Sequence, residues 1–326
     1  MNAGAHRPPL ITIVGPTAVG KSAVGLALAP KLRGEIISAD SMQVYRGMDI
    51  GTAKPTPAEQ GCVKHRLIDV ADPNELFCVA RYQELARAAI REIWSEGRMP
   101  IMVGGTGLYV DATVRGFLFP DEGRNEQIRA KLEQEAAAVG NAVLYSRLSE
   151  VDPAAAARIH PNDLRRMVRA LEVYEVTGTP ITELQRLHEG ESEFDVRQFG
   201  LRMNRDLLNE RIDARVDDMI DAGLLDEVRA LVARGCEERF TALQAIGYKE
   251  LAAFLDGREG LDEAVETVKS ETRKYAKRQM TWFRKNRDIH WLDVDGSSCP
   301  NEIADEIITI LGGWLEEVDY KLDEGL

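Results

Sequence analysis

The feature that most constrains this chain is the octapeptide at residues 15–22, which reads GPTAVGKS. It has the form G-x-x-x-x-G-K-[ST], follows an apolar run over Leu10–Val14 and precedes a helix-compatible stretch over Ala23–Leu32. In that context the loop directs backbone N–H groups at phosphate oxygens beside a helix N-terminus. The sequence therefore predicts a site for a di- or triphosphate. The loop alone does not show what becomes of the phosphate.

Strand-like and helix-like segments alternate over the first third of the chain. Four apolar runs are typical of strands: Leu10–Val14, Glu35–Ser38, Arg66–Val70 and Pro100–Val103. Helical patterns lie between them, notably over Ala23–Leu32 and Val79–Glu96. This alternation predicts an α/β fold, with a P-loop NTPase-like core in which helices cover both faces of a parallel sheet. Ligands of such sheets bind at the carboxyl ends of the strands.

The character of the chain changes from about Pro120 to Phe194, where strand-like runs disappear and helical patterns are broken by Gly and Pro. Strand patterns return over Gln198–Met203 and His290–Val294, with helical patterns between them. We therefore expect three segments: residues 1–119 as the first part of the core, 120–196 as an inserted all-helical domain, and 197–326 as the remainder of the core with C-terminal helices.

Composition narrows the classes of partner and compartment. The formal net charge of −13 by itself argues against a nucleic-acid partner. However, residues 269–287 hold eight basic side chains and one acidic one, so the average hides a basic segment. No run of about 18 apolar residues and no N-terminal signal core occurs, so we expect neither a membrane span nor export. Four widely spaced cysteines without a C-x-x-C pair favour a reduced, cytoplasmic setting over disulfides or structural zinc.

Three groups could carry chemistry or bind a polyanion. Asp40 follows the second apolar run, where a carboxylate beside a phosphate loop could act as a general base or a water-mediated magnesium ligand; the alternative is a turn or N-cap aspartate. Thr106 lies in a glycine-rich run that could approach a ligand closely or simply form a tight turn. Lys269, Arg273 and Lys277 share a helix face, which indicates either contact with a nucleic-acid backbone or an ordinary amphipathic helix.

Two arginine clusters also have a functional and a structural interpretation. Arg165, Arg166 and Arg169 could contact nucleic acid from the inserted domain, or they could pair with two glutamates further along the same helix. Arg211 and Arg215 lie four residues apart, and one of them could supply a second cation to bound phosphate. Their spacing alone favours ion pairs within the helix.

Seven blocks of sequence carry a more specific signal. The most specific is DSMQVYRGMDIGTAKP at residues 40–55. The others are GPTAVGKS (15–22), HRLID (65–69), VGGTGLY (103–109), RALEV (169–173), QAIGYKE (244–250) and YAKRQMTWFR (275–284). Together, in this order and over nearly the whole chain, they resemble the tRNA dimethylallyltransferases, also called tRNA isopentenyltransferases. The resemblance is closest to the bacterial form, which lacks the eukaryotic C-terminal zinc finger.

The resemblance implies a P-loop core with an inserted helical tRNA-binding domain. It also implies an activity: transfer of a dimethylallyl group from dimethylallyl diphosphate to the exocyclic amine of the adenosine immediately 3′ of the anticodon, in tRNAs that read codons beginning with U. By position, Asp40 resembles the base, while Thr106 and Arg215 resemble residues that support the diphosphate and the transition state. The implied diphosphate-binding residues are Gly15, Thr17, Ala18, Val19, Gly20, Lys21 and Ser22. Ser22 would also hold Mg²⁺.

The resemblance and the basic helix together define an expected nucleic-acid interface. The expected tRNA contacts are Asp40, Ser41, Met42, Gln43, Arg129, Arg165, Arg166, Arg169, Gln244, Gly247, Lys249, Lys269, Arg273, Lys277 and Arg278. The expected partners are the tRNA anticodon stem-loop and dimethylallyl diphosphate, with no membrane and with the chain acting as a monomer.

Three other functions remain compatible with the phosphate loop. A small-molecule or nucleotide kinase shares the loop and an aspartate after the second strand, but would use ATP as a phosphoryl donor. An enzyme that prenylates free adenine nucleotides would have little use for a large basic helical domain. A non-catalytic RNA-binding module would not need Asp40, Lys21 and Thr106 together.

Overall fold

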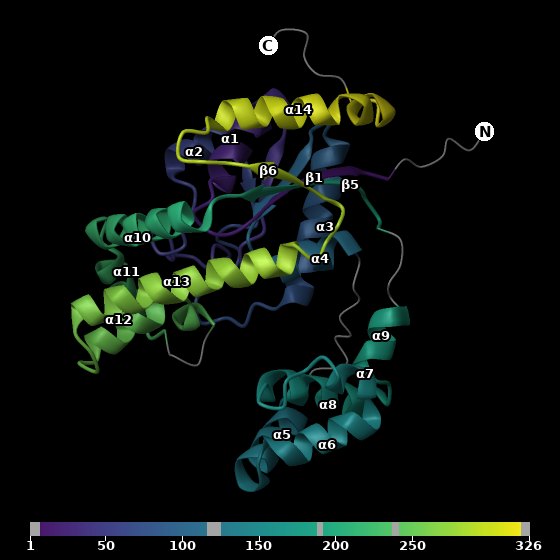
Figure 1. The fold of residues 1–326 in the computed structure, drawn as a ribbon, viewed down its shortest axis with the longest axis vertical. Coiled ribbons are helices and arrows are strands. Elements are labelled where there is room, and N and C mark those ends of the chain that lie inside the picture. Colours follow the sequence, from purple (N-terminus) through teal and green to yellow (C-terminus); the bar gives the residue numbers. More distant parts are fainter. Residues whose placement is uncertain (1–6, 116–124, 188–191, 237–240, 321–326) are drawn as a thin grey trace. The chain divides into compact units, whose positions relative to one another are not determined.

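A single sheet of six parallel strands forms the centre of the larger unit of this protein (Figure 1). The computed structural model describes residues 7–115, 125–187, 192–236 and 241–320. The strand order is β3-β2-β4-β1-β5-β6. The strands are β1 (Pro9–Val14), β2 (Glu35–Ser38), β3 (His65–Arg66), β4 (Pro100–Gly104), β5 (Asp195–Arg202) and β6 (Ile289–Asp293). This arrangement confirms the predicted α/β core with a parallel sheet.

Alternate residues of the strands enter two separate hydrophobic layers, as the period of two in a strand requires. Leu10 of β1 packs in a layer with the helices α3 (Val79–Ser95), α4 (Gly107–Arg115), α11 (Leu224–Ala233) and α12 (Tyr248–Leu255). Its neighbour Ile11 packs in the opposite layer, with α1 (Lys21–Lys31), α10 (Arg205–Asp221) and α14 (Pro300–Glu317). The sheet is therefore covered on both faces, which explains why its central strands are continuous apolar runs.

The strand register brings three chain exits to one edge of the sheet. Val14 pairs with Gly104, and Ser38 pairs with Val103. The loops that begin at Gly15, Ala39 and Gly105 therefore leave adjacent strands at the same level. In a parallel sheet this carboxyl edge is where ligands bind.

The third strand is shorter than predicted, and the expectation of a strand over Arg66–Val70 was wrong. Only His65 and Arg66 pair with β2. Leu67 and Asp69 have φ values of 65° and 56°, a left-handed conformation that a continuous strand cannot include. The turn lets the Asp69 carboxylate accept a hydrogen bond from Lys54 at 2.7 Å.

The inserted unit is entirely helical where the structure describes it. The compact unit spans Arg115–Ser192, and the rest of the chain forms the other unit. Its helices are α5 (Glu126–Val139), α6 (Asn141–Val151), α7 (Pro153–Ala156), α8 (Leu164–Thr177) and α9 (Ile181–Leu187), around a core that includes Leu132, Leu148 and Leu171. The expected end of the insertion at residue 196 lies inside β5, because the first residues of that strand already pair with Pro9 and Leu10.

Several helices were not predicted from periodicity, although the helical pattern over Thr182–His188 corresponds to α9. The helices that were not predicted include α2 (Pro57–Cys62), α6 and α7 of the inserted unit, α12, and α14 with its buried face of Ile307, Leu311 and Trp314. In α14, proline at the first helical position and the apolar spacing were available signals. Among the described residues, no helix combines the length and apolar character needed to cross a membrane.

A buried carboxylate, Glu172 of α8, ties α8 to the start of α5. Its oxygens accept hydrogen bonds from Arg129 at 2.9 Å, from Arg169 at 3.0 Å and from the N–H of Asn125 at 3.0 Å. Burial alone would raise the pKa of Glu172, but these hydrogen bonds outweigh burial and lower it. The stabilisation is therefore present above the unfolded pKa and is lost as the pH falls through the lowered one.

Replacing Glu172 with Ala is expected to destabilise the inserted unit by about 2 kcal/mol, because two partly exposed arginines lose their carboxylate. Hydrogen exchange read by mass spectrometry should show faster exchange in α5 and α8, with β1 and β4 unchanged. Glu150→Ala, at an exposed position of α6, is the matched control. Wild-type protection in E172A would contradict this role.

Candidate functional site

The phosphate loop leaves β1 at Gly15 and enters α1 at Lys21. Gly15 has a φ of 145°, and a Cβ placed there would lie 2.6 Å from the carbonyl oxygen of Leu201. Gly20 has a φ of 104° at the N-cap of α1. Both positions require glycine, one for close backbone approach and one for the left-handed turn into the helix. Ser22 is exposed in the first turn of α1.

Lys21 is held over the loop by its own backbone. Its Nζ donates a hydrogen bond to the carbonyl oxygen of Pro16 at 2.6 Å. Part of the side chain is accessible, but the ammonium group is desolvated. Burial and the nearby Arg215 lower the pKa of Lys21 to about 7, against an opposing effect of Asp40. Without an anion the site therefore disfavours the charged form of Lys21.

Asp40 follows β2, and among the described residues only one of its two carboxylate oxygens accepts hydrogen bonds from the protein. Oδ1 accepts hydrogen bonds from the N–H groups of Met42 at 2.8 Å and Gln43 at 3.4 Å. This is the turn-aspartate arrangement that the sequence left open as the structural alternative. Within the described part of the chain, Oδ2 has no recorded hydrogen bond. One side chain can thus hold its turn and still offer an acceptor to a ligand.

Thr106 links the loop after β4 to the loop of Asp40. Its Oγ1 accepts a hydrogen bond from the N–H of Ser41 at 3.0 Å and donates to the Ser41 hydroxyl at 3.3 Å. Its N–H donates to the carbonyl oxygen of Ala39 at 3.0 Å. A Cβ on Gly104 would lie 2.2 Å from that same oxygen, so the glycine permits the close approach of the two loops.

Arg215 of α10 completes the cationic side of this edge. Burial lowers the pKa of Arg215, Asp40 opposes the shift, and Arg211 reinforces it. Arg215 also acts electrostatically on Lys21, whereas Arg211 is exposed. Of the two arginines that the sequence could not separate, the structure therefore brings Arg215 together with Lys21 and Asp40.

Gln279 was not identified from the sequence as a residue of the site. It lies on α13 (Leu261–Phe283), where its Oε1 accepts a hydrogen bond from the N–H of Thr17 at 2.8 Å and its Nε2 donates to the carbonyl oxygen of Gly105 at 2.9 Å. The available signal was a glutamine in the apolar stripe that contains Ala276 and Phe283. The backbone N–H of Thr17, predicted to bind diphosphate, is thus engaged by Gln279 in this structure.

The block at residues 40–55 is fixed by two charged side chains, the partly buried Glu227 and the buried Lys54, which were not singled out from the sequence. Glu227 accepts hydrogen bonds from the N–H groups of Asp49 at 2.9 Å and Ile50 at 2.8 Å, and from the hydroxyl of Tyr248 at 2.6 Å. Lys54 is buried and donates to the carbonyl oxygen of Tyr45 at 2.9 Å. A long loop otherwise short of regular hydrogen bonds is held in one conformation.

Comparison with known proteins identifies the family. Residues 43–286 match the family described as IPP transferase, which is more than half of the chain. The chain belongs to the IPP transferase family. It is 51% identical over 303 residues to the tRNA dimethylallyltransferase of Symbiobacterium thermophilum, covering 93% of this chain and 95% of that protein. It is 46% identical over 315 residues to that of Pelotomaculum thermopropionicum, covering 97% and 100%.

Solved structures of IPP transferase relatives share the fold. The full-length tRNA isopentenylpyrophosphate transferase from Bacillus halodurans gives a TM-score of 0.70 at 46% identity, covering 95% of this chain and 97% of that one. A eukaryotic dimethylallyltransferase acting on tRNA gives a TM-score of 0.81 at 30% identity, covering 97% and 81%. The P-loop-like α/β fold is therefore shared with both.

In this IPP transferase, the predicted tRNA contacts on α13 fall into two groups. Lys269 pairs with Asp217 of α10 at 2.7 Å, and Arg273 pairs with Asp213 of the same helix. Lys277 and Arg278 are exposed and have no recorded carboxylate partner within the described residues. Lys269 and Arg273 therefore join α13 to α10 through ion pairs. The charges of Lys277 and Arg278 remain available to an external anion.

The other predicted contacts of the core lie around two loops. Ser41, Met42 and Gln43 follow Asp40, and the Gln43 amide is fully used, with Oε1 accepting from Ser38 at 2.7 Å and Nε2 donating to two backbone carbonyls. Gln244 and Gly247 flank the turn before α12, and Lys249 lies 3.3 Å from Glu250.

The predicted contacts of the inserted unit are mostly paired within that unit. Arg129 and Arg169 bind Glu172, as described above, and Arg166 lies 3.4 Å from Asp163. Arg165 is exposed, with no recorded partner among the described residues. The pairing of Arg169 with Glu172 is the structural interpretation that the sequence left open. It leaves part of each arginine accessible.

The residues present fit a magnesium ion held jointly with a substrate. Among the described residues, no group of three or more His, Cys, Asp or Glu side chains is placed to hold a metal. Ser22 offers one hydroxyl oxygen beside the phosphate loop. Mg²⁺ typically takes one or two protein oxygens together with phosphate oxygens and water, so this donor set is compatible with it.

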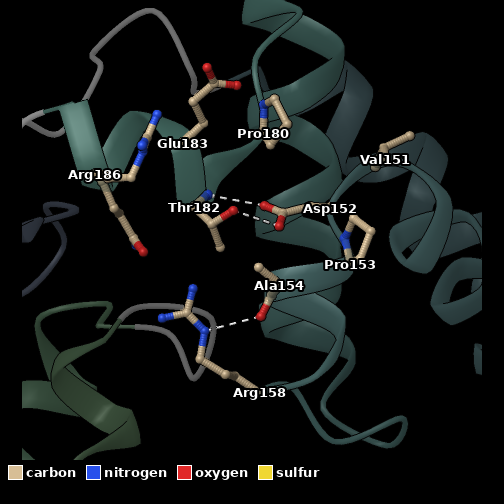
Figure 2. A pocket seen from close by; sticks show the side chains of 10 residues that line it. Val151, Asp152, Pro153, Ala154, Arg158, Pro180, Thr182, Glu183 and Arg186 are labelled. Carbon is tan, nitrogen blue, oxygen red and sulfur yellow. Dashed lines mark hydrogen bonds between the residues drawn. The ribbon is translucent and has the colours of Figure 1, made fainter.

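A hollow of about 620 Å³ lies in the inserted unit (Figure 2). Its lining includes Asp152, Arg158 and Thr182, and Thr182 donates hydrogen bonds to the Asp152 carboxylate at 3.0 and 2.6 Å. None of the predicted site residues lines it. The buried Asp152 carboxylate is therefore already engaged in hydrogen bonds within this unit.

Proposed function

We propose that this chain transfers a dimethylallyl group from dimethylallyl diphosphate to the exocyclic amine of the adenosine immediately 3′ of the anticodon in tRNAs that read codons beginning with U. The observation that carries the proposal is the meeting of Asp40 with Lys21 and Arg215 at one sheet edge. A proton acceptor thus lies next to a cationic cradle for diphosphate. The names of the relatives support both the transferred group and the tRNA substrate.

The leaving group receives most of the help, because a neutral aromatic amine is a weak nucleophile. The new bond joins the amine nitrogen to the allylic carbon, while the bond from that carbon to the diphosphate oxygen breaks and its electron pair leaves with diphosphate. Lys21, Arg215 and the loop N–H groups stabilise the charge that develops there. Bound Mg²⁺, with Ser22 among its ligands, would supply additional neutralisation of the phosphates.

Asp40 acts on the nucleophile. Its Oδ1 is fixed by the turn, so Oδ2 can accept a hydrogen bond from the amine, orient it and take the proton that the amine loses. Thr106 holds the adjacent Ser41 and thereby supports this orientation. All of these groups come from one copy of the chain, which supports a monomer as the active form.

The adenine must leave the anticodon stack to reach this edge. Extruding a base costs a few kcal/mol, which backbone contacts offset. The exposed Lys277 and Arg278 of α13 supply such contacts, and exposed arginines of the inserted unit can add others. The anticodon stem-loop is therefore the proposed partner.

Diphosphate release separates this function from a kinase. The chain is mixed with unmodified tRNA, dimethylallyl diphosphate and Mg²⁺, without ATP, and diphosphate is measured. Release that depends on tRNA supports prenyl transfer. A requirement for ATP with phosphorylation of an acceptor would support a kinase, and release with free adenine nucleotides in place of tRNA would support the smaller acceptor.

Replacing both Lys277 and Arg278 with Ala is expected to weaken tRNA binding about tenfold at roughly 0.1 M salt. It should also reduce the slope of log Kd against log salt by about 1 to 2, because about one counterion is released per phosphate contact. Filter binding over a salt series measures both quantities. Lys274→Ala is the control, since Lys274 pairs with Glu271 at 2.8 Å on the same helix. Affinity independent of salt would contradict the interface.

A further inference from the structure

Gln279 connects the two loops that border the candidate site. It lies on α13, far along the chain from both of its partners, the N–H of Thr17 in the phosphate loop and the carbonyl oxygen of Gly105 after β4. Its two hydrogen bonds use both ends of one amide. A buried glutamine that bridges two backbone segments in this way fixes their separation.

The environment of Gln279 leaves little freedom for another arrangement. The residue is only 6% exposed. A Cβ placed on Gly105 would lie 2.2 Å from Nε2 of Gln279, so the glycine permits the contact. Loss of the amide would leave a partly buried N–H and a buried carbonyl without their partner, which backbone groups in protein interiors strongly avoid.

The two hydrogen bonds of Gln279 link the loop that binds the leaving group to the residues that support the base. Thr17 belongs to the same loop as Lys21, on the leaving-group side. Gly105 is followed by Thr106, which hydrogen-bonds the N–H of Ser41 directly after Asp40. Tyr275, one turn earlier on α13, lies close to the side chains of both Thr106 and Gln279. A single helix therefore touches the cradle and the loop after β4, whose Thr106 in turn holds the loop of Asp40.

We propose that Gln279 is a positioning residue, which sets the distance between the diphosphate cradle and the loops of Asp40 and Thr106. The proposal rests on the proposed function for its kinetic part. Displacing reacting groups by about 1 Å can cost about 100-fold in rate, so a residue that touches neither substrate can control the reaction through this distance. The same residue also fixes the conformation of the loop that binds the anion.

Gln279→Met removes both hydrogen bonds at nearly constant volume. The expected result is a fall in kcat of about 10-fold or more together with a higher KM for dimethylallyl diphosphate, while the Kd for tRNA stays within about twofold. Gln83→Met is the matched control, because Gln83 is 7% exposed and donates to the carbonyl oxygen of Ala112 within α4, not to a residue of either loop. Equal kinetic losses in Q279M and Q83M would overturn the proposal.

Gln279→Glu distinguishes the contributions of the two hydrogen bonds that Gln279 makes. It can still accept from Thr17 but, when ionised, cannot donate to Gly105, and it places a negative charge beside the anion site. It should raise the KM for dimethylallyl diphosphate more than Q279M does. A KM unchanged from wild type in both variants would contradict the assignment, provided that their melting temperatures show them to be folded.

Binding of inorganic diphosphate with Mg²⁺ separates this inference from the proposed function. Calorimetry should show about 10-fold weaker binding to Q279M than to wild type and Q83M, whether or not the wild-type chain prenylates tRNA. If binding weakens as expected but the wild type transfers no dimethylallyl group, the proposed function fails and the positioning role stands. If binding by Q279M equals wild type, the positioning role fails.

Discussion

Replacing Asp40 with Asn is expected to lower the single-turnover rate of prenyl transfer by about 100-fold or more. The Asn amide oxygen can still accept the hydrogen bonds from Met42 and Gln43 that hold the turn, but the side chain can no longer take a proton from the amine. Rapid mixing of tRNA-bound enzyme with dimethylallyl diphosphate measures this rate without product release. Binding of tRNA should change little.

Asp40→Ala provides the comparison that separates the role of Oδ1 in the turn from the role of Oδ2 as the base. It removes the base and the turn hydrogen bonds together, so it should also lower thermal stability by about 1 kcal/mol, the usual worth of such bonds. If Asp40 serves only as a turn residue, D40N will keep nearly full activity and D40A alone will lose it. A loss below threefold in D40N would remove Asp40 as the base.

Replacing Lys21 with Met is expected to reduce the rate by about 100-fold to 1,000-fold, the range found when one preorganised donor to a developing negative charge is lost. The same change should raise the melting temperature, because Lys21 is desolvated beside Arg215. Loss of activity with a gain in stability would separate a functional cation from a structural one. A melting temperature below wild type would contradict this interpretation.

The pH dependence of Lys21 gives a second readout. Its folded pKa of about 7 lies below the value of 10.5 for unfolded lysine, so folding disfavours the charged form. The stability contribution is therefore present above pH 10.5 and lost as the pH falls through 7. Conversely, an anion binds the charged form. The affinity for dimethylallyl diphosphate should therefore fall as the pH rises above 7, by at most about tenfold per pH unit, and K21M should lack this dependence.

The sheet edge could be predicted because it depends on local patterns and one general rule. The strands that end at Val14, Ser38 and Gly104 are short buried runs, and parallel strands bring their carboxyl ends together. The placement of Asp40 and Thr106 beside the phosphate loop could therefore be predicted without knowing the full fold. Arg215 required the resemblance, since its spacing from Arg211 favours an ordinary surface role.

The contacts made by α13 could not be predicted, because they depend on which helix packs beside it. Asp213 and Asp217 neutralise Arg273 and Lys269 only when α10 lies against α13. Gln279 meets partners that are 262 and 174 residues away, and no local pattern reports such a contact. The length of the third strand was predicted wrongly for a different reason. An apolar composition does not reveal the positive φ values at Leu67 and Asp69 that end the strand.

Nucleoside mass spectrometry tests the central claim most directly. The chain is incubated with unmodified tRNA, dimethylallyl diphosphate and Mg²⁺; one portion of the tRNA is then digested to nucleosides, and another is cut by a base-specific ribonuclease into oligonucleotides that locate the modified residue. The prediction is that one adenosine per acceptor tRNA gains a single five-carbon unit, that the modified residue lies immediately 3′ of the anticodon, and that D40N gives almost none. Unmodified adenosine with the wild-type chain, under conditions in which it binds both substrates, would contradict the proposed function.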